Sequence, residues 1–281
     1  MNWTKGVRRP KMAVTCVRIV CFGAHPDDCE IKFGGTATKF LQAGHAVKFV
    51  ALTNGEAGHH LHAGPALAEI RRLESEEAAR RLGVEATVIM PNHDGQLLPT
   101  VEARNDVVRE IRSWEADMVF SHRPWDYHPD HRYTGQLVQD SAYLVLVPRV
   151  CPDTPPLRRN PIFLYLEDGF QTPVPFFPDI AVDITDVWDR KVDSLDAHVS
   201  QVYEWLPWVD GIADQVPQDH ASRKARLSKM WSREPNASAR AALGRRYGSA
   251  RAREVRHAEC FQICEYGRQP SAVELDEAFP L

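Results

Sequence analysis

Short apolar runs and helical patterns alternate over the first two thirds of the chain. Runs rich in β-branched residues at 17–22 and 47–52 are each followed by a segment with helical periodicity. The clearest helix is LAEIRRLESEEAARRL at 67–82, and Gly34, Gly35 and Thr36 are expected to open an earlier one that ends near residue 43. Such alternation is typical of βαβ units, whose right-handed crossovers place the strands in one parallel sheet. Further strands are predicted at 87–90, 118–120, 162–166 and 180–184, and further helices at 101–114, 131–146, 186–205 and 221–256.

The pattern changes after residue 147, where proline becomes frequent. The segment 148–178 contains CPDTPPLRRNP and TPVPFFP, which favour turns and extended structure over helix. We therefore predict an α/β, Rossmann-like three-layer fold with a mostly parallel sheet and a C-terminal helical extension. The expected divisions are a basic N-terminal tail at 1–15, a Rossmann-like domain at 16–200 with its catalytic core ending near 147, and the helical extension at 201–281.

Charge and composition narrow the class of protein. The chain has 34 Lys and Arg against 38 Asp and Glu, a net charge of −4, which offers no global attraction to nucleic acid. No apolar run approaches the roughly 20 residues that span a bilayer, so no membrane span is expected. Six scattered cysteines without a CxxC pair favour a reducing cytoplasm. The Arg-rich stretch 223–256 is interpreted as a solvated helical face or as a contact in a homo-oligomer formed through the C-terminal helices.

The first strand is followed by GAHPDDCE, at the position where a dinucleotide-binding protein carries GxGxxG. Here an imidazole and two adjacent carboxylates, from His25, Asp27 and Asp28, stand in place of the glycines that approach a pyrophosphate. Adjacent acids repel each other unless a positive charge lies beside them. A bound divalent metal is the simplest source of that charge.

A second polar cluster, YHPDH at 127–131, follows a later strand and opens a helix. Because the carboxyl ends of parallel strands meet at one edge of a sheet, both clusters are expected on the same edge. Two imidazoles and one carboxylate suffice to bind a catalytic zinc that keeps an open position for water. Such a metal lowers the pKa of its bound water to about 7.

These residues resemble a known family. AHPDD after the first strand, GGT in the following segment and HPDH on a later loop are similar to the PIG-L, or LmbE-like, de-N-acetylases. The resemblance covers about residues 17–147, with TNGEAG and the Asp-Gly loop in their expected order, and fades beyond 148. It implies a zinc-dependent hydrolase that removes an acetyl group from a small N-acetylglucosaminyl-type amino sugar or its conjugate.

The resemblance also implies roles for individual residues. His25, Asp28 and His131 would bind zinc, and Asp27 would be the general base. His128, protonated, would stand beside the developing oxyanion, and Asp130 would orient an imidazole. The residue types agree with these roles, because successive side chains at a strand end point in opposite directions and a His128–Asp130 pair would raise the proton affinity of the imidazole.

Substrate contacts are less defined by the sequence. Asp94 is interpreted either as a plain Asp-Gly turn or as an acceptor for a sugar hydroxyl, and Arg71 and Arg72 either as solvated helix charges or as a contact to substrate. Trp125, beside HPDH, is the candidate to stack on a sugar. Trp205 and Trp208 are expected in the core or at subunit contacts.

Several alternatives remain open at this stage. Cys29 stands where many family members have an acid, and a thiolate there is a possible metal ligand. The histidines of HHLH at 59–62 offer a second metal cluster or a substrate-facing loop. Fe²⁺ or another divalent metal is an alternative to zinc, and the rival functions are an amidase for a larger N-acyl or thiol-conjugate substrate and a non-haem iron oxygenase.

Overall fold

The computed structural model describes residues 16–279, so the expected tail at 1–15 lies outside the described residues. Its centre is a seven-stranded sheet with the strand order β3-β2-β1-β4-β5-β7-β6. The first five strands are parallel, and β7 runs antiparallel to both of its neighbours. The strands are β1 (Arg18–Gly23), β2 (Ala46–Thr53), β3 (Ala86–Asn92), β4 (Met118–Ser121), β5 (Ile162–Leu166), β6 (Ile180–Asp183) and β7 (Ala258–Ile263).

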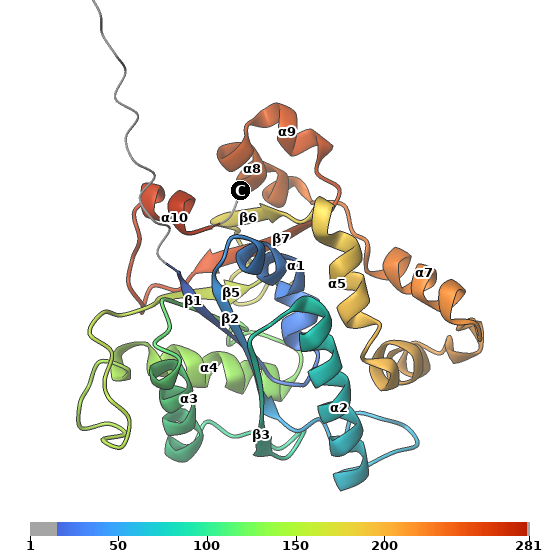
Figure 1. The fold of residues 1–281 in the computed structure, drawn as a ribbon, viewed down its shortest axis with the longest axis horizontal. Coiled ribbons are helices and arrows are strands. Elements are labelled where there is room, and N and C mark those ends of the chain that lie inside the picture. The colour runs from blue at the N-terminus through green and yellow to red at the C-terminus, as the bar shows by residue number, and fades with distance from the viewer. Residues whose placement is uncertain (1–15, 280–281) are drawn as a thin grey trace, which may run out of the picture.

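Helices cover both faces of this sheet, so the predicted α/β three-layer fold is confirmed (Figure 1). On one face α1 (Asp28–Gln42) packs with α2 (Gly64–Leu82) and α5 (Trp188–Leu195), and on the other α3 (Val101–Ser113) packs with α4 (Pro129–Leu144). The remaining helical elements are η1 (Thr185–Val187), the π-helix η2 (Ser200–Trp205), α6 (Leu206–Val209), η3 (Ala213–Gln215), α7 (His220–Trp231), α8 (Ala237–Tyr247), α9 (Ser249–Glu254) and α10 (Ala272–Ala278).

Each face of the sheet has its own apolar core, and the alternation along β1 divides between them. Ile19 and Cys21 are buried against α1 and α5, whereas Val20 and Phe22 are buried against α3 and α4. Because successive side chains of a strand point to opposite faces, a strand buried on both sides is continuously apolar. This explains why β1 and β2 are recognisable in the sequence as apolar runs that only Arg18 and Lys48 interrupt.

The GGT motif lies in the middle of α1 rather than at its start, which corrects the predicted helix boundary. At Gly35 a Cβ atom would lie 2.7 Å from Cδ1 of Ile184, so glycine permits the close approach of η1. The N–H groups of Gly35 and Thr36 donate to the buried Glu259 carboxylate at 2.9 and 2.7 Å. Lys191 donates to the same carboxylate at 2.6 Å and neutralises it. The motif therefore ties α1 to β7 and α5.

The C-terminal third departs from a purely helical extension. Residues 206–254 form four α-helices and a 3-10 turn, but β7, which has no counterpart among the predicted strands, lies inside the sheet between β5 and β6. The helix predicted at 186–205 is interrupted between α5 and η2. Both differences bring segments from beyond residue 186 against the edge of the sheet where the predicted motifs lie.

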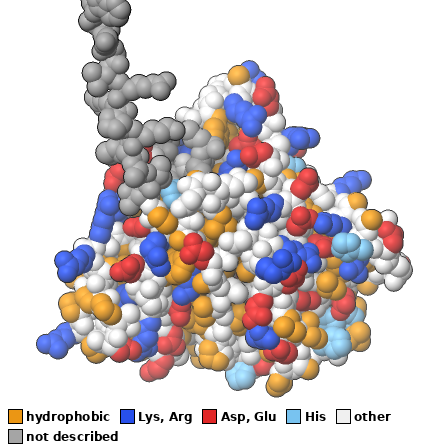
Figure 2. Space-filling model, viewed as in Figure 1, with side chains coloured by type: hydrophobic (Ala, Val, Ile, Leu, Met, Phe, Trp, Pro, Cys, Tyr) orange, Lys and Arg blue, Asp and Glu red, His pale blue; other side chains and the backbone are white. Residues whose placement is uncertain are grey.

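The surface carries charges of both signs. On the face drawn in Figure 2, basic and acidic side chains of the described residues are interspersed and no large area has a single sign. Among the described helices none has the length and apolar character to cross a membrane.

Candidate active site

The two polar clusters meet at the carboxyl edge of the sheet. Strand β1 ends at Gly23 and leads through His25 into α1, while the neighbouring parallel strand β4 ends at Ser121 and leads through a loop into α4. These ends border a cavity of about 1130 Å³. Residues of both motifs line it, namely His25, Asp27, Asp28, Asp126, Tyr127, His128 and His131.

Three side chains present ligand atoms at the spacing of a tetrahedral metal site. Nδ1 of His25 lies 3.2 Å from Nε2 of His131, and the shortest contacts of these two imidazoles with the carboxylate of Asp28 are both 3.5 Å. Ligand atoms about 2.0–2.2 Å from a tetrahedral zinc lie about 3.3–3.6 Å from one another. The Asp28 contacts use different oxygens, Oδ2 towards His25 and Oδ1 towards His131. Among the described residues, two of the groups that each present one ligand atom close enough for a shared ion are His25–His128–His131 and Asp28–His122–His131, and they meet at His131.

Asp28 is held so that one of its oxygens remains available. Its Oδ2 accepts hydrogen bonds from the N–H groups of Ala24 and His25 at 2.9 and 2.8 Å, while Oδ1 is the atom nearest His131. Burial opposes the ionisation of this carboxyl, yet the neighbouring imidazoles of His131 and His122 hold its pKa well below its usual range. Asp28 is therefore an anionic group beside His25 and His131.

His25 and His131 each turn their second ring nitrogen towards carboxylates. Nε2 of His25 lies 3.1 Å from Asp94 and 3.5 Å from Asp130, and Nδ1 of His131 lies 3.2 Å from Asp126. Burial lowers the pKa of His25, but the Asp130, Asp28 and Asp94 carboxylates together raise it well above its usual value. A carboxylate on the far nitrogen fixes the tautomer of a metal-binding imidazole and increases its basicity. The arrangement of donors thus fits a metal site.

Asp27 points towards Arg71 rather than towards the histidines. Its Oδ2 lies 3.2 Å from Nη2 of Arg71, which also donates to the carbonyl of Pro26 at 2.9 Å. Arg71 is only 2% exposed and lines the cavity, whereas Arg72 pairs with Glu69 and Glu76 on the solvent face of α2. The two adjacent arginines therefore separate: Arg71 anchors a predicted catalytic carboxylate, and Arg72 is a solvated helix charge.

The predicted pairing of His128 with Asp130 is wrong. Nδ1 of His128 accepts a hydrogen bond from the backbone N–H of Asp130 at 3.2 Å, while the Asp130 carboxylate faces His25 and accepts from the N–H of Gly95 at 2.7 Å. Burial, followed by the nearby imidazoles of His25 and His131, lowers the pKa of His128. Its Nδ1 is an acceptor, so the neutral ring carries its proton on Nε2 and can still donate a hydrogen bond.

Two residues of the site were not singled out from the sequence. His122, fully buried at the end of β4, stacks on His131 with ring centroids 4.2 Å apart, and its Nε2 lies 3.3 Å from Asp28. Asp126 contacts the other side of His131. Both lie in the segment SHRPWDYHPDH at 121–131, whose additional His and Asp before the YHPDH cluster were the available signal. His122, unlike His25, His128 and His131, is not among the residues that line the cavity, so the Asp28–His122–His131 group lies beneath the cavity surface.

A glycine allows α4 to come close enough for these contacts. At Gly135, one turn after His131, a Cβ atom would lie 2.7 Å from the carbonyl oxygen of His122 and from the backbone of Arg123. Any side chain there would push α4 away from the end of β4. Gly135 is thus needed to position His131 against His122.

Of the predicted substrate contacts, Asp94 lines the cavity and Trp125 does not. Asp94 is buried at the cavity wall, with Oδ2 accepting from the N–H of Ala57 at 3.1 Å and Oδ1 facing His25. Trp125 is 43% exposed and is not among the residues that line the cavity. Trp205, expected in the core or at a subunit contact, does line it.

Cys29 faces away from the candidate metal site. Its thiol donates to the carbonyl of Cys21 at 3.3 Å inside the core, and burial raises its pKa well above the usual value. A neutral thiol directed at a backbone carbonyl is a poor metal ligand. The alternative of a Cys29 thiolate on the metal therefore has no support in this geometry.

The histidines at 59–62 connect their loop to η2. Nδ1 of His59 accepts from the N–H groups of Leu61 and His62, and its Nε2 lies 2.9 Å from Glu204 of η2. Although His59, His62 and Glu204 lie near enough to share an ion, a metal on Nε2 would require a proton on Nδ1, where two N–H groups already point. The loop is instead tied to η2 by the His59–Glu204 contact.

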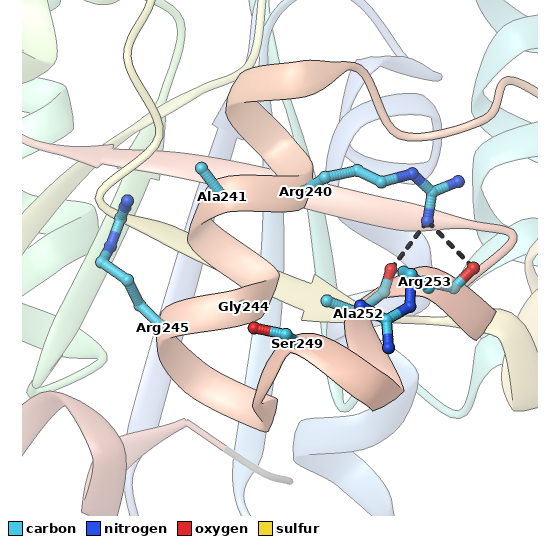
Figure 3. A pocket seen from close by; sticks show the side chains of 7 residues that line it. All are labelled: Arg240, Ala241, Gly244, Arg245, Ser249, Ala252 and Arg253. Carbon is cyan, nitrogen blue, oxygen red and sulfur yellow. Dashed lines mark hydrogen bonds between the residues drawn. The ribbon is translucent and has the colours of Figure 1, made fainter.

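A smaller hollow lies between α8 and α9, far along the chain from the two motifs (Figure 3). Arginines surround it, but Arg240 and Arg245 extend to opposite sides of α8. Arg240 donates to the carbonyls of Ala252 and Val255, and Arg245 to that of Pro178. These arginines stabilise the ends of local elements and do not converge on a ligand.

Comparison with known proteins places this geometry in a family context. A family model described as PIG-L, GlcNAc-PI de-N-acetylase, matches residues 20–142. The diacetylchitobiose deacetylase of Thermococcus kodakarensis is 32% identical over 217 residues, which cover 70% of this chain and 76% of that protein. The structure of N,N'-diacetylchitobiose deacetylase from Pyrococcus horikoshii is 27% identical, with a TM-score of 0.66 over 88% of this chain and 84% of the other.

The same fold also occurs with a different chemistry. The 4-carboxy-2-hydroxymuconate hydratase GalB from Pseudomonas putida has a TM-score of 0.66 and is 22% identical, covering 90% of this chain and 98% of that one. At that identity the likeness concerns the fold alone. The deacetylase from Thermococcus kodakarensis matches at higher identity over two thirds of both chains, and with the model match across both motifs it shows that the chain belongs to the PIG-L family of de-N-acetylases.

Proposed function

We propose that this protein is a metal-dependent hydrolase that removes the N-acetyl group from an acetylated amino sugar of the N-acetylglucosaminyl type, or from a conjugate of it. The observation that carries the proposal is the convergence of His25, Asp28 and His131 at ligand spacing in the wall of a large cavity, with Asp27 beside them. Relatives named as deacetylases support the reaction class.

His25, Asp28 and His131 would hold the metal, and zinc is the ion we propose because two imidazoles and one carboxylate are a common catalytic zinc set. A zinc ion bound there would acidify a water molecule and polarise the carbonyl of the substrate amide. The carboxylates of Asp94, Asp130 and Asp126 would keep both imidazoles in the ligating tautomer.

Asp27 would accept the proton of the attacking water. Nη2 of Arg71 lies 3.2 Å from Oδ2 of Asp27, and the other carboxylate oxygen would accept the proton at the cavity wall. Asp27 would later return this proton to the departing amine, as general acid–base catalysis at a single carboxylate requires. Arg71 would therefore act by positioning the base, and the substrate contact expected of it from the sequence stays a prediction.

His128 would donate from Nε2–H to the oxygen that gains charge as the amide carbon becomes tetrahedral. Its Nδ1 is occupied by the N–H of Asp130, which fixes the orientation of the ring at the cavity wall. A pre-oriented donor of this kind stabilises the oxyanion without reorganisation during the reaction. This proposal uses a neutral imidazole in place of the protonated one expected from the sequence.

The direct test is a deacetylation assay of the zinc-loaded protein with N-acetylglucosamine and its β-1,4 dimer, in which released acetate and free amine are both measured. We expect both products in equal amounts under anaerobic conditions. Asp27→Asn should lose most turnover and retain one equivalent of zinc. Asp153→Asn, which removes the same charge from an exposed residue, is the control.

Each rival predicts a different result. An oxygenase would require O₂, a hydratase would release no acetate, and an amidase for larger acyl groups would release amine faster from longer N-acyl chains than from the acetyl compound. Full activity of Asp27→Asn would remove the proposed base, and the absence of acetate from every N-acetylated sugar tested would overturn the proposed reaction.

A further inference from the structure

Three polar side chains are buried where the chain passes from α5 into η2. They belong to His198, Ser200 and Gln201, which are all almost completely shielded from solvent. The segment lies outside the family match at 20–142, and the proposed reaction uses none of these side chains. Burying a polar group is costly unless it is bound to a partner. The partners of the three side chains therefore indicate what the segment does.

The first two side chains bind carboxylates on two different helices. Nε2 of His198 lies 3.6 Å from Oε1 of Glu30, a buried residue in the first turn of α1. The hydroxyl of Ser200 donates to Glu74 of α2 at 2.6 Å, and the backbone N–H of Ser200 donates to the same carboxylate at 2.7 Å. One short stretch of chain thus connects α1 to α2.

Both carboxylates lie one helical turn from the proposed base or its arginine. Glu30 follows Asp27 by three residues at the start of α1, and Glu74 follows Arg71 by three residues in α2. Residues three apart are neighbours on the surface of a helix. The contacts of His198 and Ser200 therefore act on the two turns that carry the Asp27–Arg71 ion pair.

Gln201 adds a third contact, to the loop that packs on Arg71. Its Nε2 donates to the carbonyl of Gly58 at 3.0 Å, and a Cβ on Gly58 would lie 3.6 Å from Nη1 of Arg71. The carbonyl of His198 accepts from the N–H groups of Gln201 and Val202 at 3.0 and 2.9 Å, so all three contacts come from one turn of backbone. That turn opens a π-helix, a rare element that is frequent at functional sites.

The charges in this interior alternate in sign. Asp27 pairs with Arg71 at 3.2 Å, and Glu30 lies beside His198. Burial lowers the pKa of His198, but the Glu30 carboxylate raises it above its usual value, and the charges of Asp27 and Arg71 act on it in opposite directions. A buried carboxylate is strongly destabilising unless a positive charge lies beside it. His198 supplies that charge for Glu30, one turn from the base.

We propose that His198 and Ser200 are positioning residues, which hold the first turn of α1 and the Arg71 turn of α2 at the separation that the Asp27–Arg71 pair requires. Each helix contributes one member of that pair, so a small shift of either helix would turn the Asp27 carboxylate away from the attacking water. A displacement of about 1 Å can lower a rate about 10²-fold. This inference rests on the proposed function for the role of Asp27 as a base, but the geometry of the pair itself needs no turnover.

The kinetic test uses the zinc-loaded protein, with every rate divided by the amount of bound zinc. His198→Leu should lower kcat for release of acetate from N-acetylglucosamine by about 10- to 100-fold and change KM less than about 3-fold. His198→Gln retains a donor towards Glu30 and should recover most of the lost kcat. In an Asp27→Asn background, His198→Leu should lower the residual rate by less than about 2-fold, because a residue that acts through Asp27 has no further effect once the base is removed.

Two variants separate positioning from folding. Ser200→Ala removes one of the two bonds to Glu74 without changing a charge, so it should fold and lower kcat by about 3- to 10-fold. His220→Leu is the matched control, because it removes a histidine–carboxylate contact of 3.0 Å, with Asp196, from a place that does not line the cavity. This control should leave kcat unchanged.

Nuclear magnetic resonance observes the ion pair without substrate. In protein labelled with 15N-arginine, the buried and paired guanidinium of Arg71 should give separate signals for Nη1 and Nη2, which are assigned by their absence from Arg71→Lys. These signals should shift or merge in His198→Leu and in Ser200→Ala. They should remain unchanged in His220→Leu.

A kcat within about 2-fold of the unaltered protein in both His198→Leu and Ser200→Ala, or a full additional loss in the Asp27→Asn background, would overturn the positioning role. Unchanged Arg71 signals in both variants would also overturn it. Altered Arg71 signals in a protein that releases no acetate from any N-acetylated sugar would support the positioning role and refute the proposed reaction.

Discussion

The contact between Asp126 and His131 offers the sharpest test of the candidate metal site. Oδ1 of Asp126 lies 3.2 Å from Nδ1 of His131. The Asp126 side chain is 7% exposed and lines the cavity, and its pKa is lowered, against the effect of burial, chiefly by that imidazole. We consider two substitutions, Asp126→Ala and Asp126→Asn. The first removes the acceptor, and the second retains an acceptor but removes its charge.

The expected magnitude follows from the lost 3.2 Å charge contact of Asp126 with Nδ1 of His131, for which the value of a hydrogen bond to a charged group is the upper bound. A hydrogen bond to a charged group contributes about 1.5–3 kcal/mol, and a neutral one about 0.5–1.5 kcal/mol. Since about 1.4 kcal/mol corresponds to a factor of ten, Asp126→Ala should weaken zinc binding by about 10- to 100-fold, in line with other carboxylates that support a ligating histidine. Asp126→Asn should weaken zinc binding by only about 10-fold. Asp126 also accepts from the N–H of His128 at 3.1 Å, a bond that Asn can keep, so Asp126→Asn is the cleaner variant.

Zinc affinity is measured by competition with a chromophoric chelator, which requires no substrate and no turnover. Asp153→Asn again controls for the loss of one negative charge. If both Asp126 variants bind zinc within 2-fold of the unaltered protein, Nδ1 of His131 has no functional partner in Asp126, and the assignment of His131 Nε2 as a metal ligand would lose its main support.

Three further predictions concern catalysis, packing and pH. His128→Ala should retain zinc and lose about 10²–10³ in kcat, measured as acetate release, because an oxyanion donor contributes about that much; an unchanged kcat would exclude it from the mechanism. Gly135→Ala should lower the free energy of unfolding by about 1–3 kcal/mol in urea titrations, because its Cβ would meet the His122 carbonyl at 2.7 Å, and an unaltered midpoint would contradict that close approach. Asp196 is buried, which opposes its ionisation, but Tyr203, His220 and Arg81 hold its pKa below the usual value. These contacts of the ionised carboxylate stabilise the fold above the unfolded-state pKa near 4, and the stabilisation is lost as the pH falls through the lower folded-state pKa. Asp196→Asn should therefore have a lower free energy of unfolding at pH 7. Its free energy of unfolding should also fall less steeply than that of the unaltered protein as the pH is lowered.

Most of the fold could be predicted from the sequence. Buried parallel strands are continuously apolar and are separated by amphipathic helices, so β1 to β6 were all predicted close to their observed positions. Strand β7 was missed because AECFQI is short and mixes polar with apolar residues, as an antiparallel strand does. Its place between β5 and β6 depends on contacts with residues about 80–100 positions earlier in the chain.

The candidate site was predictable as a set of residues and less so as a set of pairs. AHPDD and HPDH identified the side chains that converge, because each motif follows a strand that ends at the same edge of the sheet. Proximity in sequence then suggested that Asp130 supports His128, but at the start of α4 the Asp130 side chain turns towards His25 while its backbone N–H meets His128. A pairing of this kind depends on side-chain direction, which adjacent letters do not specify.

The sequence by itself determined the layered α/β architecture, the edge of the sheet where the two polar motifs meet and the metal-binding residue types gathered there, because hydrophobic periodicity and strand-end motifs act locally. Only the tertiary structure decided which carboxylate supports which imidazole, that Arg71 is a buried anchor while Arg72 is a surface charge, and that Trp205 borders the cavity. Those outcomes depend on segments that are distant in the chain and are brought within a few ångströms by packing of the sheet and its helices, and a one-dimensional pattern contains no measure of that distance.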